Sequence, residues 1–466
     1  MINSFDYSTY LSPFTARYGS TEMRTIWSEV YKRKLWRKIW VGLANAEYKE
    51  GLLTKEELND IVSHKEDIDL VRAKEIEKAI YHELMAEIRT FSEQCKIGGG
   101  KIHLGATSTD ILDNTTIIQI HESLKITKSR LKNLLSGFSG KIKENKDTIC
   151  MGYTHLQPAE PTTLSYRFAF YAQDLLLDYE FLEKIEPFLL GKGVKGAVGT
   201  SASYTSLLSE EKSVTLESDI LRDLGIKSVD ISTQTYPRKI DLLVVEALSN
   251  IASSLHKFAF DYRIMQQPSI GEWVEKRDKN RIGSSAMPFK RNPDKAEKVC
   301  SLSRYVSSLF NSAWSNPALS LLERTLDDSA SQRIFLPEAF LAIDECLITT
   351  QKLLENLQIN MSAVEKNLSI YGQFSAVEPI LMYISKKGAD RQEMHEILKN
   401  ACMKVWEEKD RGKNISLLSI LQKDTSVTRY IDSKKLKSLL DPKNHIGLAK
   451  IRSDKFLKKL STRLKS

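Results

Sequence analysis

Residues 113–138, DNTTIIQIHESLKITKSRLKNLLSGF, show a regular spacing of apolar side chains. The apolar side chains of this stretch recur every three or four residues, at Ile117, Ile120, Leu124, Leu131, Leu134 and Phe138. This spacing places them on one side of a helix, as in helices that pack in bundles. Similar patterns of about 20 residues or more run through 163–188, 238–266, 294–313 and 334–357. The sequence therefore predicts a central bundle of five long helices.

The rest of the chain favours shorter helices on either side of this bundle. Glycine and proline are sparse, at 21 and 12 in 466 residues, and strand-like alternation is confined to short pieces such as DTICMGY. We expect an all-α fold in three domains. They are an N-terminal helical domain over 1–108, the helical bundle over 109–357 and a C-terminal helical domain over 358–466.

Composition limits the class of protein. Hydrophobic residues make up 41% of the chain and charged residues 27%, as in globular proteins. No apolar run approaches the ~20 residues of a membrane span, and the N-terminus lacks the basic and then apolar pattern of a secretory signal. We therefore expect a cytoplasmic protein. The five cysteines form no CxxC pair, which argues against both a disulfide framework and a zinc site, and we expect reduced thiols in the core.

The C-terminal residues 433–466 are strongly basic, with eleven Lys and Arg against two Asp. Such a run could hold nucleic acid or an anionic membrane. Its leucines, however, recur at the spacing of the buried side of a helix, and it has few aromatic residues on which bases could stack. We expect a solvated helical face, with neither nucleic acid nor a membrane as a partner.

Four polar segments that contain glycine interrupt the helices and hold the candidate chemistry. They are GGGKIHLGATSTD (98–110), GYTHLQPAEPTT (152–163), GKGVKGAVGTSASY (191–204) and IGSSAMPFKRNPDKAEKV (282–299). The third lacks the GK[ST] ending of a Walker loop. Three histidines, His82, His103 and His155, lie in or beside polar segments, but none is paired with another His at i+3 or i+4 as a metal site would favour. GSSAM does not match the GxSxG turn of hydrolases.

The last segment, GSSAMPFKRNP, resembles the mobile-loop motif of the fumarase and aspartase superfamily, GSSxMPxKxNP. HLGATSTDILDN and GYTHLQPAEPTT resemble its other two conserved segments, in the same order. LLERTLDDSASQRI (321–334), TQTYPRKID (233–241), ARYGSTEM (16–23) and ADRQEMHE (389–396) resemble the adenylosuccinate lyase family within it, and more its animal-type branch than the shorter bacterial type. The resemblance implies a homotetramer with shared active sites. It also implies β-elimination of fumarate from adenylosuccinate and from the succinylated aminoimidazole carboxamide ribotide, without a metal or cofactor.

The resemblance also implies roles for particular residues. On a mobile catalytic loop over 282–293, Ser284 would be the base, and His155 would be the acid that protonates the leaving nitrogen. Lys290 would supply the positive charge that a serine base needs, and Glu297 would orient the acid histidine. The implied substrate contacts are Arg17, Tyr18, His82, Glu83, Thr107, Ser108, Gln234, Asn292, Lys298, Arg324, Ser329 and Arg333.

Two positions depart from the family pattern. Tyr81 stands where the family's Arg–His–Asp triplet has its arginine, and Lys298 stands where an arginine is expected. A phenol carries no charge at neutral pH, so the other arginines would contribute more of the phosphate binding here. The alternatives are another fumarate-releasing lyase, such as argininosuccinate lyase, and a non-catalytic tetrameric scaffold.

Overall fold

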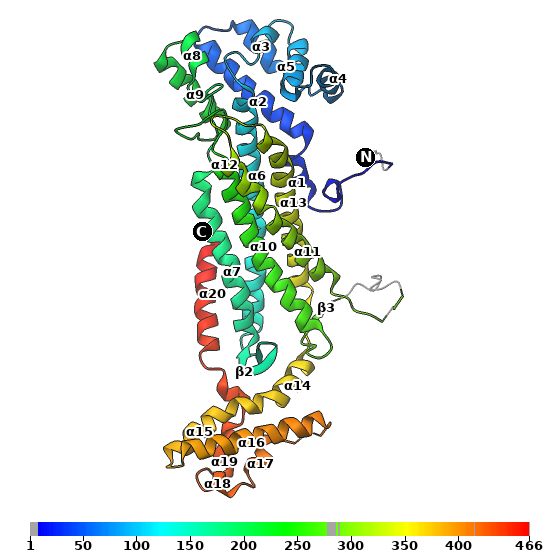
Figure 1. Ribbon diagram of the computed structural model, residues 1–466, viewed down its shortest axis with the longest axis vertical. Helices are drawn as coiled ribbons and strands as arrows, with labels where there is room; N and C mark the ends of the chain where they lie inside the picture. Colours follow the sequence, from blue (N-terminus) through cyan, green and yellow to red (C-terminus); the bar gives the residue numbers. More distant parts are fainter. Residues whose placement is uncertain (1–7, 277–285, 288, 414, 466) are drawn as a thin grey trace. The chain divides into compact units, whose positions relative to one another are not determined.

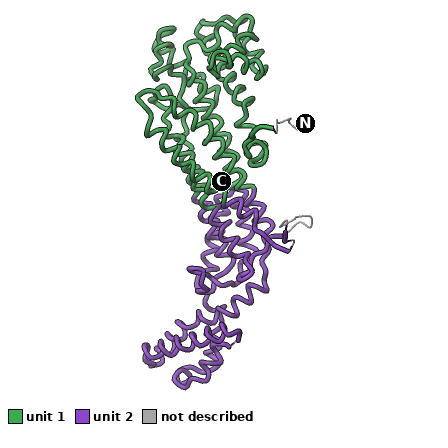
Figure 2. The backbone as a smooth tube through the Cα atoms, turned by 45° about the vertical axis from the view of Figure 1, so that its right-hand side comes forward, with its two compact units in different colours: residues 1–131, 178–255, 301–348 green, residues 132–177, 256–300, 349–466 purple. Residues whose placement is uncertain are grey.

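The structure is a computed structural model, and it describes residues 8–276, 286–287, 289–413 and 415–465. The chain forms two compact units, each assembled from three stretches of sequence (Figure 2). Unit 1 comprises Met1–Leu131, Asp178–Leu255 and Ser301–Ile348, and unit 2 comprises Lys132–Leu177, His256–Cys300 and Thr349–Ser466. The three domains expected from the sequence stay a prediction.

Helices dominate both units, so the expected all-α fold is confirmed (Figure 1). The five long segments predicted from the sequence correspond to α6 (Ser108–Glu144), α7 (Leu164–Ile185), α10 (Lys239–Gln266), α11 (Asp294–Ser308) and α13 (Asp327–Glu355). The apolar stripe predicted for α6 is buried, with exposures of 2% or less. The expected helix 294–313 is wrong at its end. It stops at Ser308, and α12 (Phe310–Leu319) begins after Leu309, whose N–H bonds to the carbonyl of Val306, three residues back, at 3.1 Å.

Unit 1 holds the N-terminal helices and a tryptophan-rich core. Its further helices are α1 (Thr21–Ile26), α2 (Glu29–Lys49), α3 (Lys55–Ser63), α4 (Leu70–Ile80), α5 (Glu83–Gln94), α8 (Ala202–Leu207) and α9 (Glu210–Leu224). Ser28 starts α2 by accepting a hydrogen bond from the Tyr31 N–H at 3.2 Å. α2 packs against α3 and α9, and its Trp36 and Trp40 are fully buried beside Phe91 of α5. This core supports the helix ends that carry the polar segments.

Unit 2 contains short strands and the C-terminal helices. The strands are β1 (Ile149–Thr154), β2 (Gln157–Thr163), β3 (Trp273–Glu275) and β4 (Leu357–Ile359), paired β1–β2 and β3–β4, both antiparallel. The helices are α14 (Met361–Tyr371), α15 (Val377–Lys386), α16 (Arg391–Asp410), α17 (Leu417–Leu421), α18 (Thr425–Thr428), α19 (Ser433–Leu439) and α20 (Ala449–Lys465). Trp273 of β3 packs among the rings of Phe168, Tyr171, Phe258 and Tyr262, which anchors the strand to α7 and α10.

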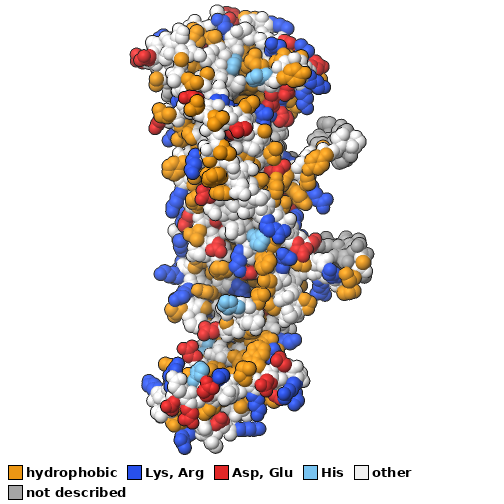
Figure 3. Space-filling view, in the orientation of Figure 1, with side chains coloured by type: hydrophobic (Ala, Val, Ile, Leu, Met, Phe, Trp, Pro, Cys, Tyr) orange, Lys and Arg blue, Asp and Glu red, His pale blue; other side chains and the backbone are white. Residues whose placement is uncertain are grey.

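The surface carries charges of both signs, and most of the cysteines are buried. On the face drawn in Figure 3, Lys and Arg side chains are interspersed with Asp and Glu. No helix in the described part of the chain has both the length and the apolar character to cross a membrane. Cys95, Cys150, Cys300 and Cys346 are buried, as expected of core residues, whereas Cys402 is half-buried, and no disulfide joins any two of the five.

Candidate active site

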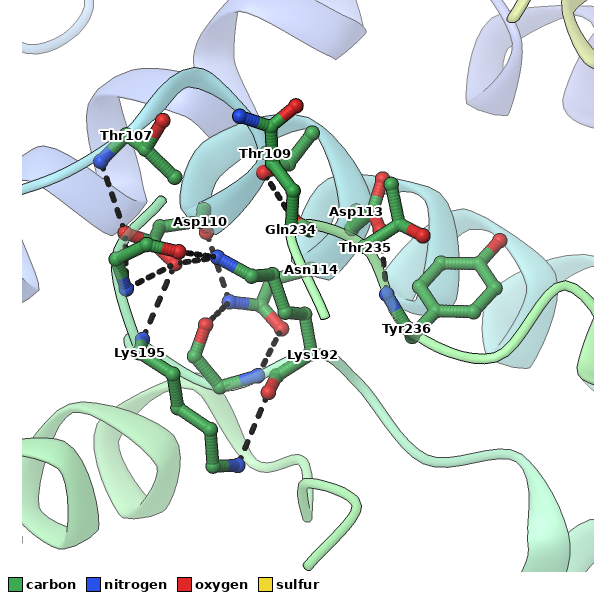
Figure 4. Close-up of polar contacts among 12 residues, drawn as sticks. Thr107, Thr109, Asp110, Asp113, Asn114, Lys192, Lys195, Gln234, Thr235 and Tyr236 are labelled. Atoms are coloured by element: carbon green, nitrogen blue, oxygen red, sulfur yellow. Dashed lines mark hydrogen bonds and ion pairs between the residues drawn. The ribbon is translucent and has the colours of Figure 1, made fainter. Parts of the chain in front are cut away.

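The N-terminal end of α6 is fixed by one buried carboxylate. Asp110 accepts hydrogen bonds from the backbone N–H groups of Thr107, Lys195 and Gly196 at 2.9, 3.1 and 3.2 Å (Figure 4). It also pairs with the ammonium of Lys192, and both side chains are fully buried. The Lys192 ammonium additionally donates to the carbonyl of Gly196 at 2.8 Å. The two polar segments 98–110 and 191–204 are therefore joined through Asp110.

A second set of ion pairs joins three of the quoted motifs, at residues 103–114, 233–241 and 321–334. Arg238 donates two hydrogen bonds to Asp113 at 3.2 and 3.3 Å, and its Nε donates to Asp328 at 2.6 Å. Asp328 also accepts from Nη1 of Arg324 at 3.0 Å. Arg238 and both aspartates are at least 94% buried, whereas the Arg324 side chain is 21% exposed. Two guanidinium groups thus balance two buried aspartates, and Arg324 is the more exposed of these two cations.

Beside these ion pairs lies a third buried acid. Asp241 accepts a hydrogen bond from the hydroxyl of Tyr236 at 2.6 Å and from Nε2 of Gln332 at 2.7 Å. Burial raises the pKa of Asp241 to about 6, and the neighbouring Arg238 opposes that rise. The carboxyl therefore changes its charge close to neutral pH.

A cavity of about 180 Å³ in unit 1 is lined by Asp113, Arg238 and Arg324 of these ion pairs. Four of the predicted substrate contacts line it, namely Glu83, Arg324, Ser329 and Arg333. Glu83 begins α5, whereas the other three lie just before or within α13, far away in the sequence. The cavity walls thus combine guanidinium groups with hydroxyl donors, which suits a phosphate or a carboxylate.

Sequence reasoning missed several polar residues of this cavity. Lys32, Thr109, Asp113, Arg238 and Gln332 also line it. Four of these five stand inside or within three residues of the quoted segments 98–110, 233–241 and 321–334, so their proximity to the motifs was the available signal. Lys32 lies on the amphipathic helix α2, and nothing in the sequence distinguishes it from a lysine on a solvent-exposed helix face.

One carboxylate already occupies the cationic side of the cavity. Glu83, in the first turn of α5, pairs with Lys32 at 2.9 Å and with Arg333 at 3.6 Å. An incoming anion therefore competes with Glu83 for these two cations. His82, which precedes it, caps α5: its Nδ1 accepts from the Met85 N–H at 3.1 Å, which leaves Nε2 as the donor nitrogen. Tyr81 is 91% exposed and ends α4 with a left-handed backbone (φ 55°).

The remaining predicted contacts of unit 1 do not line this cavity. Thr107 and Ser108 stand at the start of α6, next to Thr109, whose hydroxyl donates to the carbonyl of Gln234. The N–H of Gln234 in turn donates to the carbonyl of Glu323 at 3.2 Å, which places Gln234 against the segment 321–334.

Arg17 and Tyr18 lie on the segment before α1. Arg17 is exposed and its guanidinium lies 6.0 Å from the ring centre of Tyr18. The following Gly19 and Ser20 donate backbone N–H bonds to Glu345 and Asp344 of α13, at 3.1 and 2.7 Å. The predicted phosphate contact Arg17 is thus held next to the helix that carries Arg333.

His103 has a structural environment. Its Nδ1 accepts a hydrogen bond from the indole N–H of Trp40 at 3.1 Å. Burial lowers the pKa of His103 to about 4, although the nearby Asp110 opposes this change. The imidazole is therefore neutral at physiological pH, and its contact with a core tryptophan supports packing of the segment 98–110.

His155, the predicted acid, belongs to unit 2 and occupies an unusual turn. It follows β1 directly, and with Leu156 it forms the two-residue connection to β2, since Thr154 pairs with Gln157. Both residues have positive φ angles, 52° and 60°. His155 lines a cavity of about 510 Å³ together with Lys257 and Asp261, which form an ion pair. The cavity contains a candidate proton donor and charged neighbours.

The predicted loop 282–293 is only partly described, and Ser284 lies outside the described residues. Lys290 is exposed, and its N–H donates to the carbonyl of Met287 at 3.0 Å. Asn292 and Lys298 are half-buried. Glu297 is in the first turn of α11 and pairs with Arg263 at 3.9 Å. The assigned roles of these residues, and those of the unit 1 contacts, stay predictions.

Two family models match this chain. Residues 16–307 match a family model described as lyase, and residues 374–456 match one described as adenylosuccinate lyase C-terminus. The chain is 38% identical to adenylosuccinate lyase of Schistosoma mansoni, over 97% of this chain and 95% of that protein. It is 35% identical to adenylosuccinate lyase of Archaeoglobus fulgidus, over 97% and 99%.

Solved structures share the fold over nearly the whole length. Fumarate lyase from Mesorhizobium sp. BNC1 superposes with a TM-score of 0.84 at 23% identity, over 97% of this chain and 99% of that one. A 3-carboxy-cis,cis-muconate lactonizing enzyme from Pseudomonas putida gives 0.85 at 22% identity. At these identities the likeness concerns the fold alone, whereas the sequence matches above carry the family. From them it follows that this chain belongs to the adenylosuccinate lyase family.

Proposed function

We propose that this chain releases fumarate from adenylosuccinate to give AMP, and from the succinylated aminoimidazole carboxamide ribotide in the same way. The observation that carries the proposal is the cavity of unit 1, at which α5, α6 and the segments 233–241 and 321–334 meet. Each substrate carries one phosphate, on its ribose, and two carboxylates, on its succinyl group. Arg324, Arg333 and Ser329 supply donors of the kind that these anions require.

The proposed chemistry needs an acid, a base and stabilisation of negative charge. The base takes a weakly acidic proton from a carbon beside a carboxylate, and the acid protonates the nitrogen that leaves. We assign the acid to His155 and the base to Ser284, with Lys290 and the backbone N–H groups of its loop stabilising the charge. Glu297 orients the acid histidine in this scheme. The elimination itself requires neither a metal nor an organic cofactor.

We further propose a homotetramer in which active sites combine residues of different chains. Exposed apolar side chains support this proposal, because a monomer rarely leaves large apolar areas in water. In unit 1 they include Trp314, Leu322 and Leu326, at 54%, 91% and 73% exposed, beside the motif 321–334. In unit 2 they include Leu156 and Phe170, at 65% and 45%, beside the acid candidate.

The decisive experiment measures fumarate released by the purified protein from adenylosuccinate and, separately, from argininosuccinate. We expect release from adenylosuccinate only, and release from argininosuccinate instead would contradict the assignment. No release from either substrate would favour a non-catalytic scaffold.

Shared sites are tested by mixing two inactive variants, His155→Ala and Ser284→Ala. Each substitution should lower the rate by about 10²–10⁴. Hybrid tetramers should regain activity, because some sites then contain one intact copy of each residue. Light scattering should give about four times the 53.0 kDa chain mass, and a fully active monomer would refute the shared site.

A further inference from the structure

The turn that carries His155 is held in a backbone conformation that its sequence does not favour. A two-residue hairpin connection with two positive φ angles normally contains Asn, Asp or Gly. Here the residues are His155 and Leu156, and each left-handed residue of this kind costs about 1–2 kcal/mol. Such strain persists only where the surrounding structure determines the conformation strongly.

The contacts converge on Glu272, a fully buried acid just before β3. Its carboxylate accepts three hydrogen bonds from three elements. They come from the hydroxyl of Tyr153 on β1 at 3.2 Å, from Nη1 of Arg167 on α7 at 3.3 Å and from Nδ2 of Asn367 on α14 at 3.0 Å. Burial, together with the charge of Glu272, raises the pKa of Tyr153, so this phenol stays a donor. One carboxylate therefore fastens β1 to two helices.

Arg167 extends the attachment along the same strand. Its second terminal nitrogen, Nη2, donates to the carbonyl of Met151, two residues before Tyr153. The strand is irregular between these two attachment points, where Gly152 interrupts the register and its Cα approaches the carbonyl of Glu160 so closely that a Cβ would lie 2.7 Å from the oxygen. The pairing of β1 with β2 alone is thus weakened near the turn, and the attachment through Glu272 compensates for it.

We propose that Glu272 is a positioning residue for His155: by holding Tyr153 and Arg167 it fixes the strained turn and thereby the place of the acid. This inference rests on the proposed function of His155. Glu272 itself is buried beneath the hairpin and takes no part in proton transfer. Replacing its carboxylate with an amide brings an NH2 group against three donors, so at least one of them loses its acceptor.

The test combines Glu272→Gln with His155→Ala in a double-mutant cycle, measured as steady-state release of fumarate from adenylosuccinate. We expect Glu272→Gln to lower kcat about 10-fold with little change in KM, and to have almost no further effect when His155 is already alanine. A merely structural residue would lower the rate by the same factor in both backgrounds, and that result would overturn the proposal. An unchanged kcat in Glu272→Gln would overturn it as well.

Two further variants keep the experiment informative. Tyr153→Phe removes one donor and leaves the ion pair intact, so it should fold and show a smaller loss with the same dependence on His155. Asp424→Ala is the matched control. It removes a hydrogen bond of 2.9 Å from the Ser426 N–H at the start of α18, away from the hairpin, and it should leave kcat unchanged.

Hydrogen exchange of the segment 149–163 separates this inference from the proposed function. Exchange there should be faster in Glu272→Gln and Tyr153→Phe, and unchanged in Asp424→Ala. If the wild-type protein releases no fumarate and exchange still increases, the proposed function fails while Glu272 retains its role in holding the turn. If the wild-type protein is active, but neither exchange nor kcat responds to Glu272→Gln, only the present inference fails.

Discussion

The buried pair of Asp110 and Lys192 leads to an asymmetric prediction. In Lys192→Met, the Asp110 carboxylate keeps its three backbone N–H donors, from Thr107, Lys195 and Gly196. In Asp110→Asn, the ammonium of Lys192 keeps only the carbonyl of Gly196 in this cluster, and the new amide group faces N–H donors. We therefore expect Asp110→Asn to destabilise the protein more than Lys192→Met does.

The magnitude follows from the burial of both groups. Leaving one partner of a buried ion pair uncompensated costs about 3–5 kcal/mol. For a cooperative unit of about 250 residues, 1 kcal/mol corresponds to a shift in Tm of about 2 °C. Asp110→Asn should thus lower Tm by about 6–10 °C, and Lys192→Met by about half of that. The Tm of the double variant should lie above that of Asp110→Asn, because the double variant contains no unpaired buried charge.

Thermal unfolding at one scan rate, followed by circular dichroism, checks these values. Lys49→Met is the control, since Lys49 pairs with Asp219 at the surface and should change Tm little. Asp110→Asn should also raise KM for adenylosuccinate, because the freed Thr107 stands among the proposed substrate contacts. A Lys192→Met variant as unstable as Asp110→Asn would show that the backbone donors do not sustain the carboxylate, and the reasoning would be wrong.

Three other outcomes are expected. Asp328→Asn should raise KM for adenylosuccinate several-fold with a smaller change in kcat, because it frees Arg324 from its anchor; unchanged steady-state kinetics would contradict this. Glu47 is buried without a hydrogen-bond partner among the described residues, and burial raises its pKa to about 8. The free energy of unfolding should therefore fall as pH rises from about 4.5 to 8. In Glu47→Gln, the midpoint of chemical denaturation should depend less on pH over that range. The pKa of His103 is lowered to about 4, so the unfolded chain binds more protons between about pH 4 and 6.5; stability should rise with pH there, and less so in His103→Gln.

The sequence predicted the helices better than their contacts. The stripe from Ile117 to Phe138 was sufficient for α6, because helical burial follows a local period. The break at Leu309 has no glycine or proline at the joint, so no local signal marked it. The ion pairs of Arg238 join residues that are 90 and 125 positions apart, and a local pattern does not encode such a pairing.

In the candidate site, too, the sequence predicted individual residues better than the contacts between them. Motif resemblance identified Arg324, Ser329 and Arg333, and these residues line one cavity. It could not indicate that Glu83 would hold Lys32 and Arg333, because that depends on how α2, α5 and α13 pack. The turn at His155 was also invisible, since the sequence THLQ lacks the Asn or Gly that usually marks such a hairpin.

The strained connection between β1 and β2 affects which substitutions should appear when this protein is evolved for heat resistance. Replacing Leu156 with glycine would relieve about 1 kcal/mol of strain, so selection for survival at high temperature alone should favour that change. The same change widens the range of conformations open to the neighbouring histidine. Variants selected for both heat resistance and turnover should therefore keep Leu156 and acquire stabilising substitutions at other positions. Laboratory evolution with the two selections run in parallel would show this difference.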